Sequence, residues 1–145
     1  MVGSSRAIRV LNALIDEHPD LPVVLDPVLA SGAGQAVVDA AMLNQLRQNL
    51  LRRSTLITPN IPEAFTLTAA RNPAECAARL LAAGARWVLI TGTHDDTDDV
   101  TNWLFNDEGF RQSWSWPRLK GQFHGSGCTL ASAIAARLAL GMDLP

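Results

Sequence analysis

The sequence predicts an α/β fold: a central, mainly parallel sheet with helices on both faces and an antiparallel hairpin at one edge. Short apolar runs alternate with segments whose apolar residues recur every three or four positions, which is typical of strands alternating with helices. Two later apolar runs are separated by Asn106-Asp107-Glu108-Gly109, which favours a hairpin with a four-residue loop. The 145 residues are enough for one domain with a sizeable core.

The first third of the chain is predicted to contain two helices around one strand. Residues 5–16 carry apolar side chains along one helical face, and residues 35–51 repeat them at i, i+4 spacing. Between them, residues 23–25 form a short apolar run bounded by proline, which indicates a buried strand. The loop that follows this strand extends from Asp26 to Gly34.

The middle of the chain is predicted to form a strand at residues 55–58, a short helix at 60–69 and a second helix up to about Ala83. The second helix has the best start signal, because Asn72 is an N-cap residue with Pro73 at N1 and Glu75 at N3. Gly84 then follows as the residue that ends it.

The last third of the chain begins with the clearest strand, at residues 87–91, which Gly92 ends. An acidic loop, a hairpin, a glycine-rich turn and a small-residue helix follow it. In order, these are expected at residues 94–99, at 100–105 with 110–116, at 121–127 and at 128–140. In open α/β sheets ligands bind beyond the carboxyl ends of the strands, so the loops at 26–34, 59–63 and 92–99 are candidate site loops.

Composition and charge exclude several classes of protein. The chain is 48% apolar and 18% charged, which excludes a disordered protein, and its net charge of −2 provides no field for nucleic acid or anionic membrane. No apolar run reaches the ~18–20 residues of a membrane span. The two cysteines form neither a CxxC pair nor a disulfide framework. We therefore expect a soluble protein of the reducing cytoplasm.

The glycine-rich turn is the sharpest candidate site. In Gly125-Ser126-Gly127-Cys128, glycines free the backbone N–H groups to face a concavity, and the helix start adds unpaired donors and a positive dipole end. Such a turn suits a phosphate or an oxyanion. A thiol pKa tends to fall at a helix start, so Cys128 could act as base or nucleophile. An ordinary turn before a packed helix, with Cys128 buried, explains the pattern equally well.

A second candidate site lies at the ends of two predicted strands. Asn60 and Glu63 are three residues apart and could hold a Mg²⁺–phosphate assembly, while Asp26 could orient metal-bound water. On the residues alone, helix capping by Asn60 and Glu63 is the better explanation, and Asp26 is as well explained as a turn residue.

Other patterns in the sequence give little or no indication of a functional site. Ser31-Gly32-Ala33-Gly34 lacks the third glycine of a dinucleotide fingerprint, and the acidic residues between 95 and 99 lack calcium-loop spacing. The tryptophans of the hairpin, Trp103, Trp114 and Trp116, are interpreted as packing residues. Cys76 shares a helical face with apolar residues and is expected in the core.

Four stretches of the chain together carry a family resemblance. They are Val24-Leu25-Asp26-Pro27-Val28, Thr58-Pro59-Asn60-Ile61-Pro62-Glu63-Ala64, Leu89-Ile90-Thr91-Gly92-Thr93-His94 and His124-Gly125-Ser126-Gly127-Cys128-Thr129-Leu130. Their order and approximate spacing resemble the hydroxymethylpyrimidine/phosphomethylpyrimidine kinases of thiamine biosynthesis, which are ribokinase-like. The last stretch is the most specific, because most of that superfamily has Asp where this chain has Cys128.

The resemblance implies ATP-dependent phosphorylation of hydroxymethylpyrimidine and then of its monophosphate. It assigns Cys128 as the catalytic base, or as the group positioned at the acceptor oxygen. Gly125, Ser126 and Gly127 would form the anion hole for the transferring phosphoryl group. Both roles agree with the needs of phosphoryl transfer, which are positioning and charge stabilisation.

The resemblance also implies the cofactors ATP and Mg²⁺. Thr91, Gly92 and Asn60 would contact the nucleotide, and Glu63 and Asp26 would serve the metal. Asn60 and Glu63 can do this and still cap a helix, so the resemblance favours a functional role for the pair.

By the same resemblance, residues 1–145 are the C-terminal part of a single ribokinase-like domain. Met1-Val2-Gly3-Ser4 is similar to a mid-chain stretch of the family, and the N-terminal glycine-rich substrate motif has no match. Thr91 stands where a lysine is common, and Gln122-Phe123 where small polar residues are usual. The ATP half is thus represented and most of the pyrimidine pocket is not. The implied partners are a small pyrimidine substrate and a second copy in a homodimer.

Three alternatives stay open at this stage. Pyridoxal kinase activity is one, because a cysteine in this loop also occurs in relatives that act on pyridoxal. A truncated, non-catalytic fragment that binds nucleotide or a partner is another. The third is a Cys-dependent hydrolase that uses Cys128 with His124.

Overall fold

A five-stranded sheet in the order β1-β2-β3-β4-β5 forms the centre of the molecule. The strands span Val24–Leu25, Leu56–Ile57, Trp87–Thr91, Asp99–Asn106 and Arg111–Pro117. Strands β1, β2 and β3 run parallel to one another, and β4 runs antiparallel to both of its neighbours, β3 and β5. This confirms the predicted sheet: β1, β2 and β3 form its parallel part, and β4 and β5 form the antiparallel hairpin at one edge. Our computed structural model describes residues 4–29, 39–94, 97–121 and 123–145.

The helices follow the predicted order. They span Ser5–Glu17 (α1), Ala40–Gln45 (α2), Ile61–Thr68 (α3), Pro73–Ala82 (α4) and Ser126–Ala139 (α5). Within the described residues, none of these helices has the length and apolarity that a membrane crossing requires.

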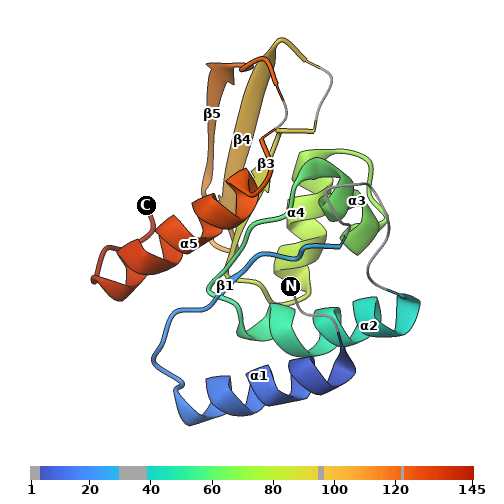
Figure 1. Ribbon diagram of the computed structural model, residues 1–145, viewed down its shortest axis with the longest axis vertical. Helices are drawn as coiled ribbons and strands as arrows, with labels where there is room; N and C mark the ends of the chain where they lie inside the picture. Colours follow the sequence, from blue (N-terminus) through green and yellow to red (C-terminus); the bar gives the residue numbers. More distant parts are fainter. Residues whose placement is uncertain (1–3, 30–38, 95–96, 122) are drawn as a thin grey trace.

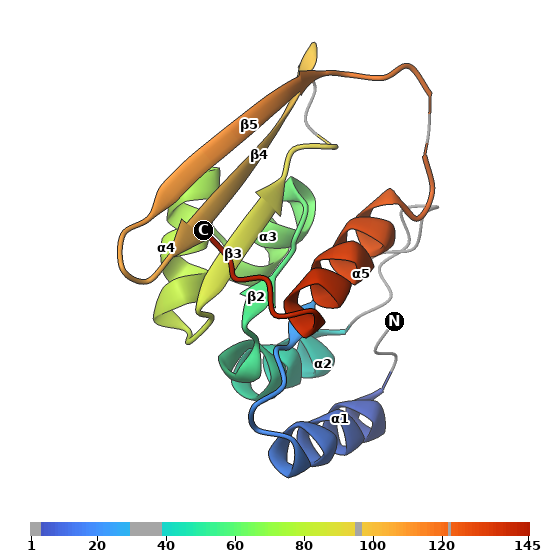
Figure 2. The ribbon, with the colours of Figure 1, turned by 90° about the vertical axis from the view of Figure 1, so that its left-hand side faces the viewer.

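Helices cover both faces of the sheet, as predicted. One face packs on α1 to α4 and forms the larger core, to which the strands contribute Leu25, Ile57, Val88, Ile90 and Phe105. On the other face the buried core residues, within the part of the chain that the structure describes, are Leu56, Leu89 and Leu104, and α5 packs on them. Figure 2 shows α5 on one side of the sheet with α3 and α4 on the other, and the β4–β5 hairpin extends beyond the helices in Figure 1.

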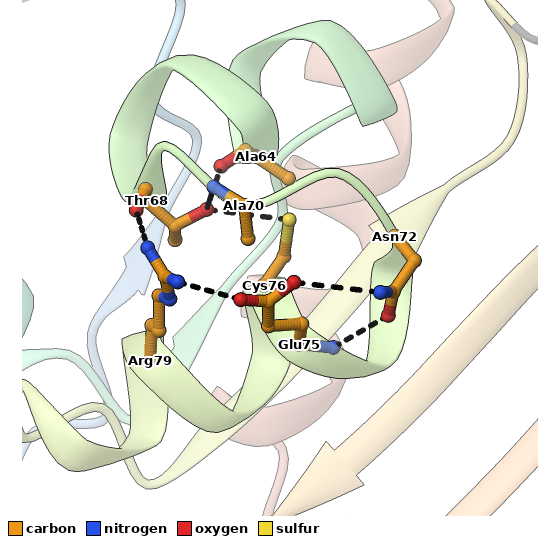
Figure 3. A network of polar contacts seen from close by, with 7 residues as sticks. All are labelled: Ala64, Thr68, Ala70, Asn72, Glu75, Cys76 and Arg79. Atoms are coloured by element: carbon orange, nitrogen blue, oxygen red, sulfur yellow. Dashed lines mark hydrogen bonds and ion pairs between the residues drawn. The ribbon is translucent and has the colours of Figure 1, made fainter.

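The junction of α3 and α4 is closed by side chains of both helices (Figure 3). The Thr68 hydroxyl donates to the Cys76 sulfur over 3.3 Å, and Arg79 donates to the Thr68 carbonyl over 2.8 Å. Arg79 also pairs with Glu75 at 2.5 Å, and the Glu75 N–H donates to the Asn72 side chain over 2.9 Å. Cys76 is fully buried, which confirms its expected place in the core.

Two predicted helices have different boundaries in the structure. The helix expected at residues 35–51 begins at Ala40, with the Asp39 carboxylate accepting from the Met42 N–H. It continues as a π-helical turn at Leu46–Leu50 and a 3₁₀ turn at Leu51–Arg53. Residues 35–38 and Ser31-Gly32-Ala33-Gly34 lie outside the described residues. Helix α5 begins two residues earlier than predicted, at Ser126, because Gly125 already acts as its cap.

The packing role expected of the tryptophans holds for two of the three. Trp103 packs on the larger core and Trp114 on the smaller one, from successive strands of the hairpin. Trp116 is 50% exposed, so its expected packing role is wrong. Strand β5 is the outer strand of the sheet, and Trp116 lies near its carboxyl end, next to Pro117.

Candidate active site

The carboxyl ends of three parallel strands bring the predicted site loops together. Asp26 follows β1, Asn60 follows β2 and Gly92 follows β3. Parallel register joins β1 to β2 and β2 to β3, so these ends meet at one edge of the sheet. Beyond the named strands, Asn60 bridges to Thr91, and the Thr91 N–H donates to the Pro59 carbonyl over 3.0 Å.

Asn60 and Glu63 form a reciprocal capping box at the start of α3. The Asn60 side chain accepts from the Glu63 N–H over 2.9 Å, and Glu63 Oε2 accepts from the Asn60 N–H over 3.0 Å. The other oxygen, Oε1, accepts from the Leu29 N–H over 3.3 Å. Glu63 therefore caps α3 and also ties the loop after β1 to the loop after β2. The capping interpretation of this pair is correct.

Glu63 is an electrostatically strained carboxylate. Burial raises its pKa above the ordinary value, the two backbone donors act in the opposite direction, and the nearby Asp26 carboxylate raises it further. The protein thus places two carboxylates close together, and the ion pairs found among the described residues, Arg53 with Asp16 and Arg79 with Glu75, involve neither of them. A cation bound here would relieve that repulsion.

The donor set of Asp26, Glu63 and Asn60 fits Mg²⁺ held mainly through water and phosphate. Mg²⁺ binds through one or two carboxylates, keeps several waters and takes phosphate oxygens as ligands. Each Glu63 oxygen accepts one backbone bond and retains a free lone pair. The described residues contain no group of three or more His, Cys, Asp and Glu side chains that could hold a metal by themselves.

Thr91 and Gly92 are buried at the end of β3, and Gly92 has a packing reason to be glycine. A Cβ at this position would lie 2.2 Å from the Thr101 carbonyl oxygen, so no larger residue fits. The Gly92 N–H donates to the Asn102 side chain over 3.1 Å. The close approach of β4 therefore explains this glycine without a ligand, and its nucleotide contact stays a prediction.

The turn before α5 has the features of an open anion site. Gly125 caps the helix with φ of +81°, a left-handed conformation that favours glycine. Among the described residues, no side chain caps the first turn of α5, and Ser126, Gly127 and Cys128 are all exposed. A Cβ added at Gly125 or Gly127 would meet nothing within 4 Å. The Gly127 position is thus free of packing demands.

Cys128 is an exposed thiol in the first turn of α5, which excludes the buried role considered from the sequence. The expected fall of its pKa is wrong: the pKa is raised. The main cause is the Asp26 carboxylate, which accepts a hydrogen bond from the protonated thiol, and slight burial and the negative charge of Asp26 add to it. The backbone at the helix start acts to lower the thiol pKa, but the Asp26 carboxylate outweighs it.

The raised pKa of Cys128 speaks against the alternative of a Cys–His hydrolase. The group that lies against the Cys128 thiol is Asp26, and His124 is an exposed residue of the turn that precedes the helix. A carboxylate beside a protonated thiol suppresses the thiolate that a cysteine hydrolase needs.

Two basic residues at this edge are missing from the sequence prediction. Arg118 and Lys120 follow β5 and, with Thr97 and Asp98 of the β3–β4 loop, line an open hollow of about 700 Å³. The signal in the sequence was weak: two cations in the segment between a strand and the glycine-rich turn. The partners of Arg118 lie 19 to 26 residues away, and no local pattern indicates them.

The chain matches the phosphomethylpyrimidine kinase family over residues 1–145. It is 39% identical to a hydroxymethylpyrimidine/phosphomethylpyrimidine kinase of Streptomyces coelicolor, over all of this chain and 55% of that protein. It is 38% identical to the thiamine biosynthesis bifunctional protein ThiED of Geobacter sulfurreducens, over 99% of this chain and 30% of that protein. The chain thus spans about half the length, or less, of these relatives.

Solved structures show the same fold. The pyridoxal kinase of Bacillus subtilis in an ADP complex matches with a TM-score of 0.86 at 29% identity, over 99% of this chain and 56% of that one. The phosphomethylpyrimidine kinase of Clostridium difficile matches with a TM-score of 0.79 at 28% identity, over 99% of this chain and 60% of that one. The ribokinase-like α/β fold expected from the resemblance is confirmed.

Proposed function

The chain belongs to the phosphomethylpyrimidine kinase family, and we propose that it carries the nucleotide and phosphoryl-transfer half of an ATP-dependent hydroxymethylpyrimidine and phosphomethylpyrimidine kinase. The observation that carries this proposal is the uncapped start of α5, with open space around Gly125 and Gly127, at the sheet edge that also presents Asp26. Phosphoryl transfer needs donors fixed where negative charge develops, and these backbone groups supply them.

The backbone N–H groups of Ser126, Gly127 and Cys128 are the proposed anion hole. They are oriented by the helix itself, so they need no reorganisation when charge moves onto the transferring phosphoryl oxygens. The positive end of the α5 dipole acts in the same direction. Gly125 provides the turn that aims this end of the helix outward.

Asn60, Glu63 and Asp26 are the proposed holders of the metal and phosphate network. Asn60 and Glu63 are fixed by their capping box, and Asp26 follows the neighbouring strand. Mg²⁺ bound there would neutralise the phosphate charge of the nucleotide. Thr91 and Gly92 are proposed to line the nucleotide site from the end of β3, next to Asn60.

Cys128 is proposed as the group that positions the acceptor oxygen. With its pKa raised, the thiol is protonated at neutral pH and donates to Asp26. A protonated thiol is a poor general base, but it can hold a hydroxyl group in line with the phosphorus atom. Since catalysis of phosphoryl transfer is mostly positioning and electrostatics, that role suffices.

A second acceptor, pyridoxal, is supported by the similarity to the Bacillus subtilis pyridoxal kinase. Both candidate acceptors are planar heterocycles with a hydroxymethyl group, and the same anion hole serves either. We place the pyrimidine first because the curated relatives carry that name.

A cytoplasmic location and a homodimer complete the proposal. Both cysteines are free thiols, which agrees with a reducing compartment. Dimerisation is proposed from the family resemblance and is checked by light scattering of the purified chain.

The test is transfer of phosphate from Mg-ATP to hydroxymethylpyrimidine, with pyridoxal as competing acceptor. We expect the pyrimidine monophosphate and diphosphate as products and a higher kcat/KM for the pyrimidine. A higher kcat/KM for pyridoxal would reverse the order of the two acceptors. Saturable Mg-ATP binding without transfer to either would favour the non-catalytic fragment, and the kinase assignment of this chain would then be wrong.

A further inference from the structure

Arg118 is the most heavily used side chain at the site edge. It follows β5, and its guanidinium donates to the carbonyls of Thr97 and Thr93, each over 2.6 Å. Longer bonds reach the carbonyls of Gly92 and Asp99, both over 3.4 Å, and the Thr97 hydroxyl over 3.3 Å. One side chain thus binds the beginning and the end of the loop that joins β3 to β4.

These bonds hold the β3–β4 loop against the segment that leads into the turn at Gly125–Cys128. We call this turn the anion turn because it contains the proposed anion hole. The Arg118 N–H also donates to the Asp98 carbonyl over 2.9 Å. From the other side, the Asn102 side chain accepts from the Gly92 N–H. The base of the loop is therefore held between β4 and the residue after β5. Only a guanidinium offers five donors in a planar fork, which suits several carbonyls on one side.

The bonds between Arg118 and the β3–β4 loop, which we call the Arg118 clamp, lie next to the proposed nucleotide site. Gly92, one of its partners, is proposed to line the nucleotide site, and Arg118 itself precedes Gly125, the cap of α5, by seven residues. The hollow beside it is lined by Thr97 and Asp98 from the loop and by residues 118–121 from the segment after β5. The shape of this hollow is thus set by the bonds of Arg118.

We propose that Arg118 is a positioning residue for nucleotide binding: it holds the β3–β4 loop and the segment before the anion turn at the separation that Mg-ATP requires. This inference rests on the proposed function for its ligand. Arg118 acts through the loop carbonyls, so no contact with the nucleotide is needed. Its loss should loosen the loop while the sheet and the two cores remain, because its partners lie in this loop and at Asp99, the first residue of β4.

The test compares Arg118→Met and Arg118→Lys with the parent chain and with Arg86→Met. Arg86 is an exposed arginine just before β3, at the opposite end of that strand. Titration with Mg-ATP by calorimetry measures affinity, and hydrogen exchange of peptides that include Gly92 and Thr97–Asp99 measures local opening. Thermal unfolding of each variant shows whether the fold persists.

We expect Arg118→Met to weaken Mg-ATP binding about tenfold or more and to speed exchange in the loop, with the rest of the sheet unchanged. Arg118→Lys should recover part of the affinity, because an ammonium group still reaches the two nearest carbonyls. Arg86→Met should match the parent in both measurements.

Equal Mg-ATP affinity in the parent and in Arg118→Met would overturn the proposal. Equal loss in Arg118→Met and Arg86→Met would overturn it as well, since the effect would then be that of charge alone. If the parent itself shows no Mg-ATP binding, the proposed function fails. Hydrogen exchange then decides on the clamp: faster loop exchange in Arg118→Met supports it, and unchanged exchange refutes it.

Discussion

Helices α4 and α5 lie on opposite faces of the same sheet, and their first turns are built in opposite ways. Helix α4 begins at an Asn72 cap whose side chain accepts from the Glu75 N–H, and its inner face buries Cys76, Ala77 and Leu80. Helix α5 begins at a glycine with positive φ, has no side-chain cap among the described residues and buries only Ala131.

The two helix starts differ in whether their backbone N–H groups stabilise the helix or are open to a ligand. At the start of α4, Pro73 has no N–H and the N–H groups of Glu75 and Cys76 both donate to Asn72. Arg79 and Thr68 close the junction with α3. Such an end has little left to offer a ligand. In α5 the same groups remain open beside Asp26 and Cys128. The two cysteines of the chain, one in each helix, therefore have different roles.

The largest expected effect is in the core beneath α4. Leu80 is 2% exposed, so Leu80→Ala should lower the free energy of unfolding by roughly 2–5 kcal/mol. Leu130 of α5 is only partly buried on the smaller core, so Leu130→Ala should lower it by about 1 kcal/mol. Urea unfolding measures both. Equal losses of unfolding free energy in the two variants would contradict this expectation, because α5 would then be as firmly packed as α4.

The next effect separates the two cysteines. Cys128→Ala should slow phosphoryl transfer about 100-fold, or about 2.7 kcal/mol in the barrier, through loss of positioning. Its unfolding free energy should stay within about 0.5 kcal/mol of the parent, since the side chain is exposed. Cys76→Ala should instead lower stability, because it opens a cavity in the core.

Serine at position 128 sharpens this result. A hydroxyl can still donate to Asp26 and hold the acceptor, so Cys128→Ser should retain much more activity than Cys128→Ala. If the serine and alanine variants lose activity equally, a thiolate base is required and the positioning role is wrong.

The helix caps should differ by a smaller amount. Asn72→Ala removes a side-chain cap and should lower the free energy of unfolding by about 1 kcal/mol. Ser126 at the start of α5 donates to the Phe123 carbonyl and caps no N–H group, so Ser126→Ala should change it by less than about 0.5 kcal/mol. Thermal unfolding monitored by circular dichroism compares them. A larger loss from Ser126→Ala would show that α5 has a cap after all.

Thiol reactivity tests the contact between Cys128 and Asp26. The carboxylate raises the thiol pKa, so Asp26→Asn should lower it and speed alkylation by iodoacetamide at pH 8. The rate measured across pH gives the midpoint directly. Cys76 provides the internal reference, since burial also raises its pKa and Asp26 is not among the causes. An unchanged pKa of the Cys128 thiol in Asp26→Asn would show that Asp26 does not contact this thiol.

The smallest expected effect is the pH dependence contributed by Glu63. Its pKa is raised in the folded state, so the folded chain binds this proton more tightly than the unfolded chain does. Between the ordinary value of 4.5 and the raised pKa, the free energy of unfolding therefore falls as pH rises. Glu63→Gln should remove this part of the decline. A steeper decline in the variant would contradict the raised pKa.

Much of the fold follows from local patterns in the sequence. The strands at 87–91 and in the hairpin, the Asn72 cap and the Asn60–Glu63 capping box all depend on residues within a few positions of one another. The boundaries of α2 did not follow, because the i, i+4 spacing of apolar residues does not distinguish an α-helix from the π and 3₁₀ turns that continue it.

The candidate site is predicted only as far as its residues act locally. The sequence indicates Gly125, Gly127 and Cys128 because a helix start has a local signature. It does not indicate that Asp26 faces Cys128, a contact across about a hundred positions that reverses the expected direction of the thiol pKa. The bonds of Arg118 are missed for the same reason.

The central claim is that the open start of α5 and the neighbouring loops form a nucleotide site. Calorimetric titration of the chain with Mg-ATP, paired with thermal unfolding in the same buffer, tests it most directly. We predict saturable heat and an upward shift of Tm that grows with Mg-ATP concentration. No heat and no shift of Tm would contradict the claim, and the uncapped start of α5 would then have no nucleotide to bind.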